Sequence, residues 1–257
     1  MTTFQAPGDA RARSGSLPGT RALVLIAPAA IEIAVLGTLF LLYNLGRLVA
    51  RNEEVQAKAH ADLVRRLEDS LGLPSEAALQ STLSSVPHLF TFANQYYVTL
   101  HFPVMIAFLV FGFVARPRAQ YVWARNLIVV QTFLALALHM SFPLAPPRMF
   151  PQWGFVDTMS VFGPSAYDGA SASAANQFAA MPSLHIGWAL LIAVVLVRTA
   201  PKPLAVLAVL HAAITVFVVV VTANHWWIDG VVAAGLLMVA LRIFPGPVEK
   251  GQLPQRK

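Results

Sequence analysis

A histidine and an aspartate four residues apart are the pair in this chain whose types and spacing best suit chemistry. His225 and Asp229 lie in the segment NHWWIDGV, directly before a long apolar run. If a helix begins at or before His225, both side chains share one face of it. A carboxylate in that place fixes the tautomer of the imidazole and stabilises a positive charge on it, as a histidine nucleophile or general base requires. The alternative is a helix-end hydrogen bond with a packing role only.

Two other segments carry polar groups that suit an anionic substrate. In MPSLHIGW, Pro182 and Ser183 favour the start of a helix, whose free N–H groups and positive dipole end attract phosphate. His185 follows directly and can donate a proton to a leaving oxygen. In PLAPPRM, Arg148 offers a planar guanidinium that grips phosphate with two hydrogen bonds. The alternatives are a serine that only caps, a histidine at the membrane interface and an arginine that extends to lipid headgroups.

A polar stripe lies near one end of a further apolar segment. Asn94, Tyr97 and His101 recur at helical spacing, and we expect them to line a pocket for the substrate headgroup. An aromatic belt at the membrane interface is the alternative. Glu32, an acid within the first apolar segment, is a functional candidate by default, or it pairs with a polar neighbour. A zinc site is disfavoured, because the histidines come from separate segments and no HExxH motif or second carboxylate joins them.

The composition places these residues in a membrane protein. Of the 257 residues, 57% are hydrophobic and only 12% are charged, whereas soluble domains average about 25% charged residues. The net charge of +6 would fit a nucleic-acid-binding protein, but the basic residues lie in short loops beside apolar runs, as membrane topology requires. The chain has no cysteine, which excludes disulfides, thiolate metal sites and a cysteine nucleophile.

Six apolar runs approach the length of about 20 residues that a membrane-spanning helix needs. They cover residues 22–46, 89–114, 122–144, 184–199, 203–223 and 227–244. We therefore expect an all-α, multi-pass integral membrane protein with a bundle of about six transmembrane helices over residues 22–244. Polar cytoplasmic tails, 1–21 and 245–257, are expected on either side of it. The first run is too long for a cleavable signal peptide and is expected to be a retained anchor.

Two polar stretches interrupt the predicted bundle. In the insertion 47–88, an amphipathic helix is expected to lie on the membrane surface without a catalytic role. Its apolar stripe recurs every four residues, at Val55, Ala59, Leu63 and Leu67. Residues 145–182 are expected to form the active-site loop.

The distribution of lysine and arginine predicts how the bundle is oriented. The larger share falls on one side of a six-helix model, so the positive-inside rule puts both termini in the cytoplasm. The three segments that carry chemistry then meet near the outer face of the cytoplasmic (plasma) membrane.

Together the segments resemble the signatures of a known family. PSLH (182–185) and HWWID (225–229) resemble the second and third signatures of the type-2 phosphatidic acid phosphatase superfamily. APPR (145–148) and NQYYVTLH (94–101) resemble its branch of inositol phosphorylceramide synthases and sphingomyelin synthases. The resemblance covers about residues 90–240 and implies an inositolphosphotransferase-like lipid phosphotransferase or a lipid-phosphate phosphatase, with no metal or other cofactor. The implied partners are a lipid phosphate or phospholipid and a lipid or polyol alcohol, or water, as acceptor, and no nucleic acid.

The resemblance also implies a role for each polar residue. His225 would attack phosphorus and form a phosphohistidine, and Asp229 would orient His225. His185 would protonate the leaving group and then activate the acceptor. Arg148 would hold the phosphate, assisted by Ser183.

The chain departs from the superfamily pattern in two places. Ser141 stands where the first signature has a lysine, and Val218 and Val219 stand where the third signature has serine and arginine. A site with less positive charge suits a phosphodiester better than a monoester, which carries nearly two charges. We therefore favour headgroup transfer over hydrolysis, with the lipid and acceptor left open. A lipid or small-molecule transporter or flippase, with polar residues along a path through the bundle, is the alternative function.

Overall fold

The computed structural model describes residues 29–42, 53–166 and 177–246. The regular elements in these ranges are helices, apart from one isolated parallel bridge between Leu144 and Ala179. The all-helical prediction is thus confirmed for the described part of the chain. The predicted tails fall outside these ranges, except for the first residues of the C-terminal one.

The chain divides into two compact units, Met1–Leu41 and Leu42–Lys257. The first holds all but the last residue of the helix Ala29–Leu42, which is the described part of the first predicted span and carries Glu32. The second unit holds every other candidate residue.

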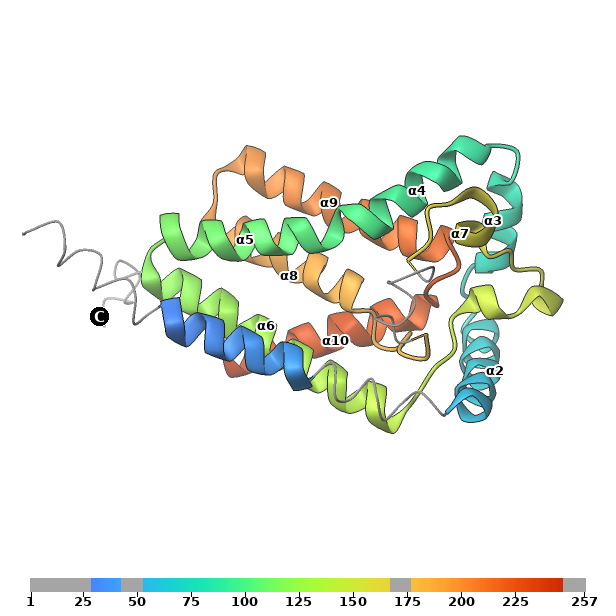
Figure 1. Ribbon diagram of the computed structural model, residues 1–257, viewed down its shortest axis with the longest axis horizontal. Helices are drawn as coiled ribbons and strands as arrows, with labels where there is room; N and C mark the ends of the chain where they lie inside the picture. Colours follow the sequence, from blue (N-terminus) through green and yellow to red (C-terminus); the bar gives the residue numbers. More distant parts are fainter. Residues whose placement is uncertain (1–28, 43–52, 167–176, 247–257) are drawn as a thin grey trace, which may run out of the picture. The chain divides into compact units, whose positions relative to one another are not determined.

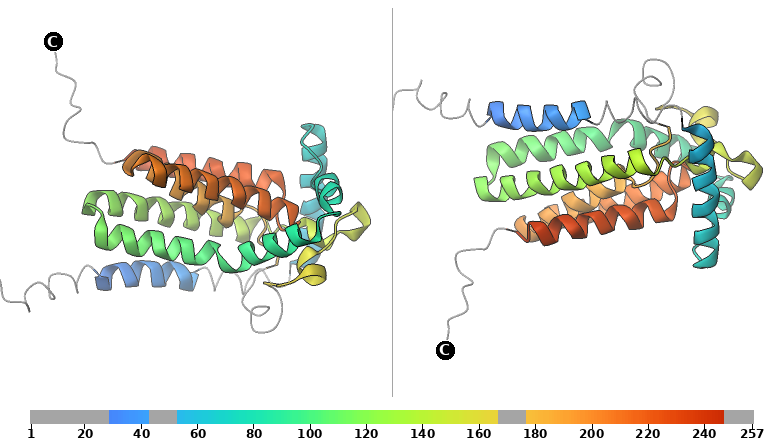
Figure 2. Two further views of the ribbon diagram at one scale, coloured as in Figure 1. Left: turned by 90° about the horizontal axis from the view of Figure 1, so that it is seen from above. Right: turned by 90° about the horizontal axis from the view of Figure 1, so that it is seen from below.

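A bundle of apolar helices forms the main body of the second unit, and its members run side by side in Figures 1 and 2. They are α5 His101–Ala115, α6 Arg118–Ser141, α8 Leu184–Thr199, α9 Lys202–Val221 and α10 Trp227–Ile243. The last four match predicted apolar runs to within a few residues. By length and composition, α6 and α9 can cross a membrane, whereas α8 and α10 are shorter, with 16 and 17 residues.

The predicted span 89–114 is broken into two helices, which corrects the expectation of one continuous helix. α4, Pro87–Thr99, meets α5 at Leu100 with an angle of 40°, and the pair makes a third candidate span if it is counted as one bent helix. Pro103 explains the break. A proline has no N–H to give to the carbonyl four residues earlier, here that of Thr99, and its ring clashes with that carbonyl.

α8 lies at the centre of the bundle and packs against α5, α6, α9 and α10. Gly187 permits its close approach to α6, because a Cβ atom there would lie 2.7 Å from Nε2 of Gln131. That nitrogen donates a hydrogen bond to the Ala233 carbonyl of α10 (3.1 Å). The small Gly187 therefore leaves room for a buried amide that links α6 to α10 while α8 packs against it.

One end of the bundle is covered by short elements, and α2 lies across this end (Figures 1 and 2). They are α2 Glu54–Ser70, α3 Glu76–Leu83, η2 Pro147–Met149, η3 Pro151–Trp153 and α7 Thr158–Phe162. The amphipathic helix is confirmed in α2, but its apolar stripe faces outward, with Val55 86% exposed and Leu63 55% exposed. The small residues Ala57 and Ala61 face the protein instead, because they let α2 lie close against the core.

Candidate active site

The three segments singled out in the sequence meet at the end of the bundle that α2 covers, and main-chain hydrogen bonds join them. Leu144 donates to the Phe178 carbonyl (2.7 Å) and accepts from the Ala180 N–H (3.2 Å). The Arg148 N–H donates to Ala223 (2.8 Å), and the Ser183 N–H donates to Asp229 (3.2 Å). The predicted convergence of these segments is therefore confirmed.

His225 is held by the turn between α9 and α10. The Val219 carbonyl accepts the N–H groups of both Asn224 and His225, at 3.0 and 3.1 Å. Ala223 completes the turn in the left-handed region, with φ at 55°, where a non-glycine residue is strained. The backbone of this turn thus fixes the position of the His225 Cα atom, from which the side chain extends.

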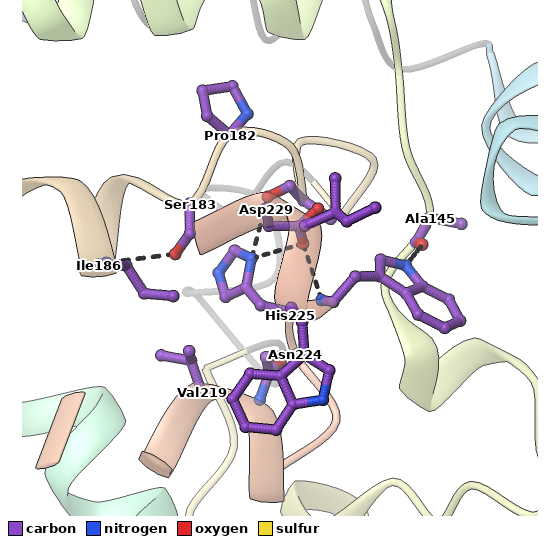
Figure 3. A network of polar contacts seen from close by, with 12 residues as sticks. Ala145, Pro182, Ser183, Ile186, Val219, Asn224, His225 and Asp229 are labelled. Atoms are coloured by element: carbon purple, nitrogen blue, oxygen red, sulfur yellow. Dashed lines mark hydrogen bonds and ion pairs between the residues drawn. The ribbon is translucent and has the colours of Figure 1, made fainter. Parts of the chain in front are cut away.

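The imidazole itself is fixed through one nitrogen, as Figure 3 shows. Nδ1 of His225 lies 2.9 Å from the Ala180 carbonyl oxygen and 3.1 Å from Oδ2 of Asp229. Both neighbours are acceptors when the carboxylate is ionised, so Nδ1 carries the proton. Nε2 is then left with its lone pair, which is the form that a nucleophile requires. The predicted His225–Asp229 contact is confirmed.

Asp229 is fully buried in the first turn of α10. Its Oδ2 also accepts the N–H of Trp226 (2.9 Å), which satisfies one of the free donors at the helix start. Trp226 is anchored in turn through its indole N–H to the Ala145 carbonyl (3.0 Å). Asp229 therefore joins the helix start and the catalytic histidine candidate in one hydrogen-bond network.

His185 lies in the first turn of α8, whose start is capped by Ser183. The Ser183 hydroxyl accepts the Ile186 N–H (3.3 Å), and its own O–H is still able to donate to a ligand. The His185 ring centroid is 5.9 Å from that of His225. The two histidine rings therefore lie near each other, with His185 in the first turn of α8 and His225 in the turn before α10.

Two further predicted residues surround His185. The Tyr97 ring stacks on it with centroids 4.3 Å apart, and the His101 ring lies 4.4 Å away. His101 is 2% exposed, and neither of its ring nitrogens has a hydrogen-bond partner among the described residues. The bend at Leu100 places both rings beside His185, since Tyr97 comes from α4 and His101 from α5. Whether they contact a substrate headgroup stays a prediction.

Arg148 is a buried cation next to this group. Its Nη1 donates to Oδ1 of Asn224 (3.1 Å), and its Nε lies 3.9 Å from Oδ2 of Asp157. The charge of Arg148 is close enough to act on His225 electrostatically. A guanidinium held in place by two side chains, and removed from water, suits the binding of a phosphate.

Asn94, another predicted binding residue, is hydrogen-bonded to the segment that contains α7. Its amide nitrogen donates to the carbonyls of Thr158 (2.8 Å) and Gly163 (3.2 Å), and its oxygen accepts the Thr158 hydroxyl (2.9 Å). These bonds attach α7 to α4. Contact between Asn94 and substrate stays a prediction, while an anchoring role is evident from the geometry.

The structure adds residues that the sequence did not single out. Asn224 holds Arg148, and its only signal was its place directly before His225. Glu68 and Glu76, from the polar insertion, are buried against the start of α10. No sequence pattern distinguished these two acids from their exposed neighbours.

At the three positions where this chain departs from the superfamily signatures, the side chains are uncharged. Ser141 is exposed at the end of α6, and its hydroxyl donates to the Ala137 carbonyl of its own helix (2.9 Å). Val218 and Val219 are buried in an apolar cluster. Within the described ranges, no three His, Asp or Glu side chains are grouped so as to hold a metal ion.

A helical bundle with a histidine–aspartate pair, a second histidine and a buried arginine at one end has the groups that phosphoryl transfer requires. Comparison with known proteins agrees with this class. The family model of the PAP2 superfamily matches residues 62–243, and the chain belongs to that superfamily. The matched range contains all the candidate site residues.

The match to a curated relative indicates which branch of the superfamily this chain resembles. The inositol phosphorylceramide synthase catalytic subunit aur1 of Schizosaccharomyces pombe (strain 972 / ATCC 24843) is 32% identical over 142 residues, 48% of this chain and 33% of the relative. The chain therefore matches about a third of that relative's length. No solved structure matches the chain. The predicted resemblance to the inositol phosphorylceramide synthase-like branch is thereby confirmed.

Proposed function

We propose that this protein is a metal-independent membrane lipid phosphotransferase that moves a phospho-headgroup to an alcohol through a phosphohistidine at His225. The observation that carries the proposal is the pair of acceptors on Nδ1, the Ala180 carbonyl and the Asp229 carboxylate. They leave Nε2 unprotonated, and the ring of a second histidine, His185, lies with its centroid 5.9 Å from that of His225, where it can serve the leaving group. Membership of the PAP2 superfamily supports the assignment.

The reaction has two balanced halves. In the first, Nε2 of His225 attacks phosphorus, a P–N bond forms, and the bond to the leaving oxygen breaks as His185 gives that oxygen a proton. In the second, His185 takes the proton of the acceptor hydroxyl, whose oxygen attacks phosphorus while the P–N bond breaks. Asp229 stabilises the positive charge on the His225 ring, and Arg148 holds the phosphate oxygens.

The charge of the site supports a diester substrate and therefore headgroup transfer. Ser141 and the Val218–Val219 pair add no cation, so Arg148 is the basic side chain beside the two histidines in the described part of the chain. A phosphodiester carries about one charge, whereas a monoester carries nearly two. The relative's name describes a synthase of inositol phosphorylceramide, itself a phosphodiester, which agrees with this preference.

We propose that the protein crosses the plasma membrane six times, with both termini in the cytoplasm and the site at the outer face. The apolar lengths of α6 and α9 support a membrane domain. The outward stripe of α2, which includes Val55, Leu63 and Leu67, suits a helix that rests on the membrane surface at the site's end of the bundle.

The test is a transfer assay with purified protein in detergent and a chelator. Wild type, His225→Ala and the matched control His88→Ala, an exposed histidine outside the site, would receive phosphorus-labelled phospholipid or lipid monophosphate, with or without a lipid alcohol. Label on the alcohol with wild type and the control, but not with His225→Ala, supports the transferase. Inorganic phosphate as the sole labelled product would make the enzyme a hydrolase. Equal turnover by His225→Ala would refute the nucleophile.

Detection of the intermediate gives a second, independent test. Rapid quenching at alkaline pH, followed by peptide mass spectrometry, should find the phospho-adduct on the peptide that contains His225. The adduct should be absent from the His225→Ala variant and should accumulate when the alcohol is withheld.

A further inference from the structure

The first turn of α10 is held by carboxyl groups from outside that helix. The Trp227 N–H donates to Oε1 of Glu76 (3.1 Å), and the Ile228 N–H donates to Oε1 of Glu68 (2.8 Å). With Asp229 on the preceding N–H, three successive amides at the helix start each have a carboxyl acceptor. Amides at a helix start have no main-chain carbonyl acceptor within that helix, and they lie at the positive end of its dipole.

Both glutamates are buried and come from separate helices. Glu68 of α2 and Glu76 of α3 are each 4% exposed, and neither forms an ion pair with a lysine or arginine in the described part of the chain. Burial and like charge both favour the protonated form of two adjacent carboxyl groups that form no ion pair, so at neutral pH we expect one of them to keep its proton. Burial and the neighbouring Glu76 raise the pKa of Glu68 to about 9, and burial also raises the pKa of Glu76.

The position of the proton follows from the contacts. Oε1 of Glu68 accepts the Ile228 N–H, whereas its Oε2 has no hydrogen-bond partner among the described residues. Oε2 is therefore the oxygen available to carry a proton, which it can share with the Glu76 carboxyl group beside it.

We propose that Glu68 and Glu76 form a carboxyl–carboxylate pair that positions the first turn of α10, and through it His225 and Asp229. Neither glutamate needs to touch substrate, so both are positioning residues. The pair binds amides within three residues of His225, and a displacement of about 1 Å in a catalytic group can cost about 100-fold in rate. The kinetic part of this inference rests on the proposed function, but the structural part does not.

The pair has a route to solvent protons. A cleft of about 130 Å³ is lined by Glu68 and Glu76 together with Arg65, Asp69 and aromatic side chains. The charged groups near the pair are Asp229 from α10 and, in the lining of the same cleft, Arg65 and Asp69 from α2. Arg65 is already bound to Asp69 at 3.3 Å. When the pair loses its proton, two buried anions repel each other and Asp229, and the hold on α10 weakens.

The pH dependence has a defined sign. Because the pKa of Glu68 is raised from 4.5 to about 9, the folded protein keeps a proton that the unfolded chain releases within this window. Stability is therefore greatest at the low end of the window and falls as the pH rises toward about 9.

Three variants test separately the two roles of Glu68, as a hydrogen-bond acceptor and as a group that can ionise. Glu68→Gln keeps an oxygen for the Ile228 N–H and replaces the proton-bearing oxygen by an amide donor, but it cannot ionise. Glu68→Ala removes the acceptor. Glu54→Gln is the matched control, since Glu54 is exposed on the same helix and pairs with Lys58.

The first measurement needs no substrate. For the full chain in detergent, hydrogen–deuterium exchange of peptides covering 224–230 and the melting temperature would be followed from about pH 6 to about pH 9.5. Glu68→Ala should exchange about tenfold faster over this segment, whereas Glu68→Gln and the control should match wild type at pH 7. The melting temperature of wild type and of Glu54→Gln should fall as the pH rises, and that of Glu68→Gln should fall less.

The second measurement is kinetic. Glu68→Ala should lower kcat by about 10- to 100-fold with little change in KM. Glu68→Gln should keep the neutral-pH kcat and retain it at alkaline pH, where wild type loses activity. If wild type shows no turnover, the proposed function fails while exchange and melting still decide the inference.

The inference is overturned by any of three results. They are unchanged exchange over 224–230 in Glu68→Ala, damage by Glu68→Gln equal to that by Glu68→Ala, or the same pH dependence of melting in wild type and Glu68→Gln. If the alanine variant does not fold, the comparison of Glu68→Gln with wild type across pH still provides the test.

Discussion

Asp229→Asn separates the charge of this side chain from its hydrogen bonds. Oδ2 of Asp229 accepts from both His225 and Trp226, while Oδ1 has no hydrogen-bond partner in the described part of the structure. Asparagine can therefore place its oxygen at the Oδ2 position and its amide at the Oδ1 position. Both hydrogen bonds are then kept. The Ala180 carbonyl, 2.9 Å from Nδ1, still holds the same tautomer of His225.

The loss of charge sets the size of the effect. A hydrogen bond to a charged group contributes about 1.5–3 kcal/mol and a neutral one about 0.5–1.5 kcal/mol. The difference of about 1–1.5 kcal/mol acts when the His225 ring becomes positive, so kcat should fall about tenfold. Asp229→Ala loses the acceptor as well and should lower kcat by about 100-fold.

The assay is kcat for headgroup transfer at saturating substrate and pH 7. Asp62→Asn, at a half-buried carboxylate of α2 that pairs with Arg66 away from the site, is the control, and melting temperatures would show that each variant is folded. A loss of about 10⁴-fold in Asp229→Asn, as in triads where the carboxylate alone sets the tautomer, would refute the role given to the Ala180 carbonyl. Full activity would refute the development of positive charge on His225.

Substitutions at four further positions have defined outcomes. Arg148→Lys loses the planar fork, so KM should rise about tenfold in the transfer assay. Asn94→Ala leaves α7 groups unsatisfied and should lower the unfolding free energy by about 1–3 kcal/mol, measured by denaturant titration, without changing KM. Gly187→Ala forces a Cβ against Gln131 and should lower the melting temperature. Tyr97→Leu removes the ring that stacks on His185 and should lower kcat/KM several-fold. A raised KM in Asn94→Ala would instead support the predicted headgroup contact.

Much of the bundle could be predicted because its signals are local. The helices that became α6, α8, α9 and α10 are apolar runs bounded by polar or proline-containing turns, and their positions follow from the sequence alone. The meeting of the segments around Arg148, His185 and His225 also followed, because alternate ends of antiparallel helices return to the same side.

The remaining features depend on contacts between distant residues. The stripe of α2 was expected to mark its membrane-facing side, but nothing in that pattern showed that Glu68, on the other side, would be buried against α10. Asn94 and Thr158 are separated by 64 positions, and their mutual hydrogen bonds arise only when α4 and α7 pack. Pro103 did carry a local signal for the break at Leu100, but a membrane bundle can tolerate a proline without one.

The main-chain bonds that join the three segments of the site have a consequence for how such an enzyme can change over evolutionary time. The bonds between Leu144 and Phe178, between Arg148 and Ala223, and from Ser183 to Asp229 use backbone atoms at both ends. Their geometry does not depend on which side chains these positions carry. Residues that select the headgroup or acceptor can therefore be exchanged while the frame around the nucleophile persists. A library of variants confined to these loops should yield many folded proteins of altered substrate preference, whereas one directed at Gly187 or Gln131 should yield few.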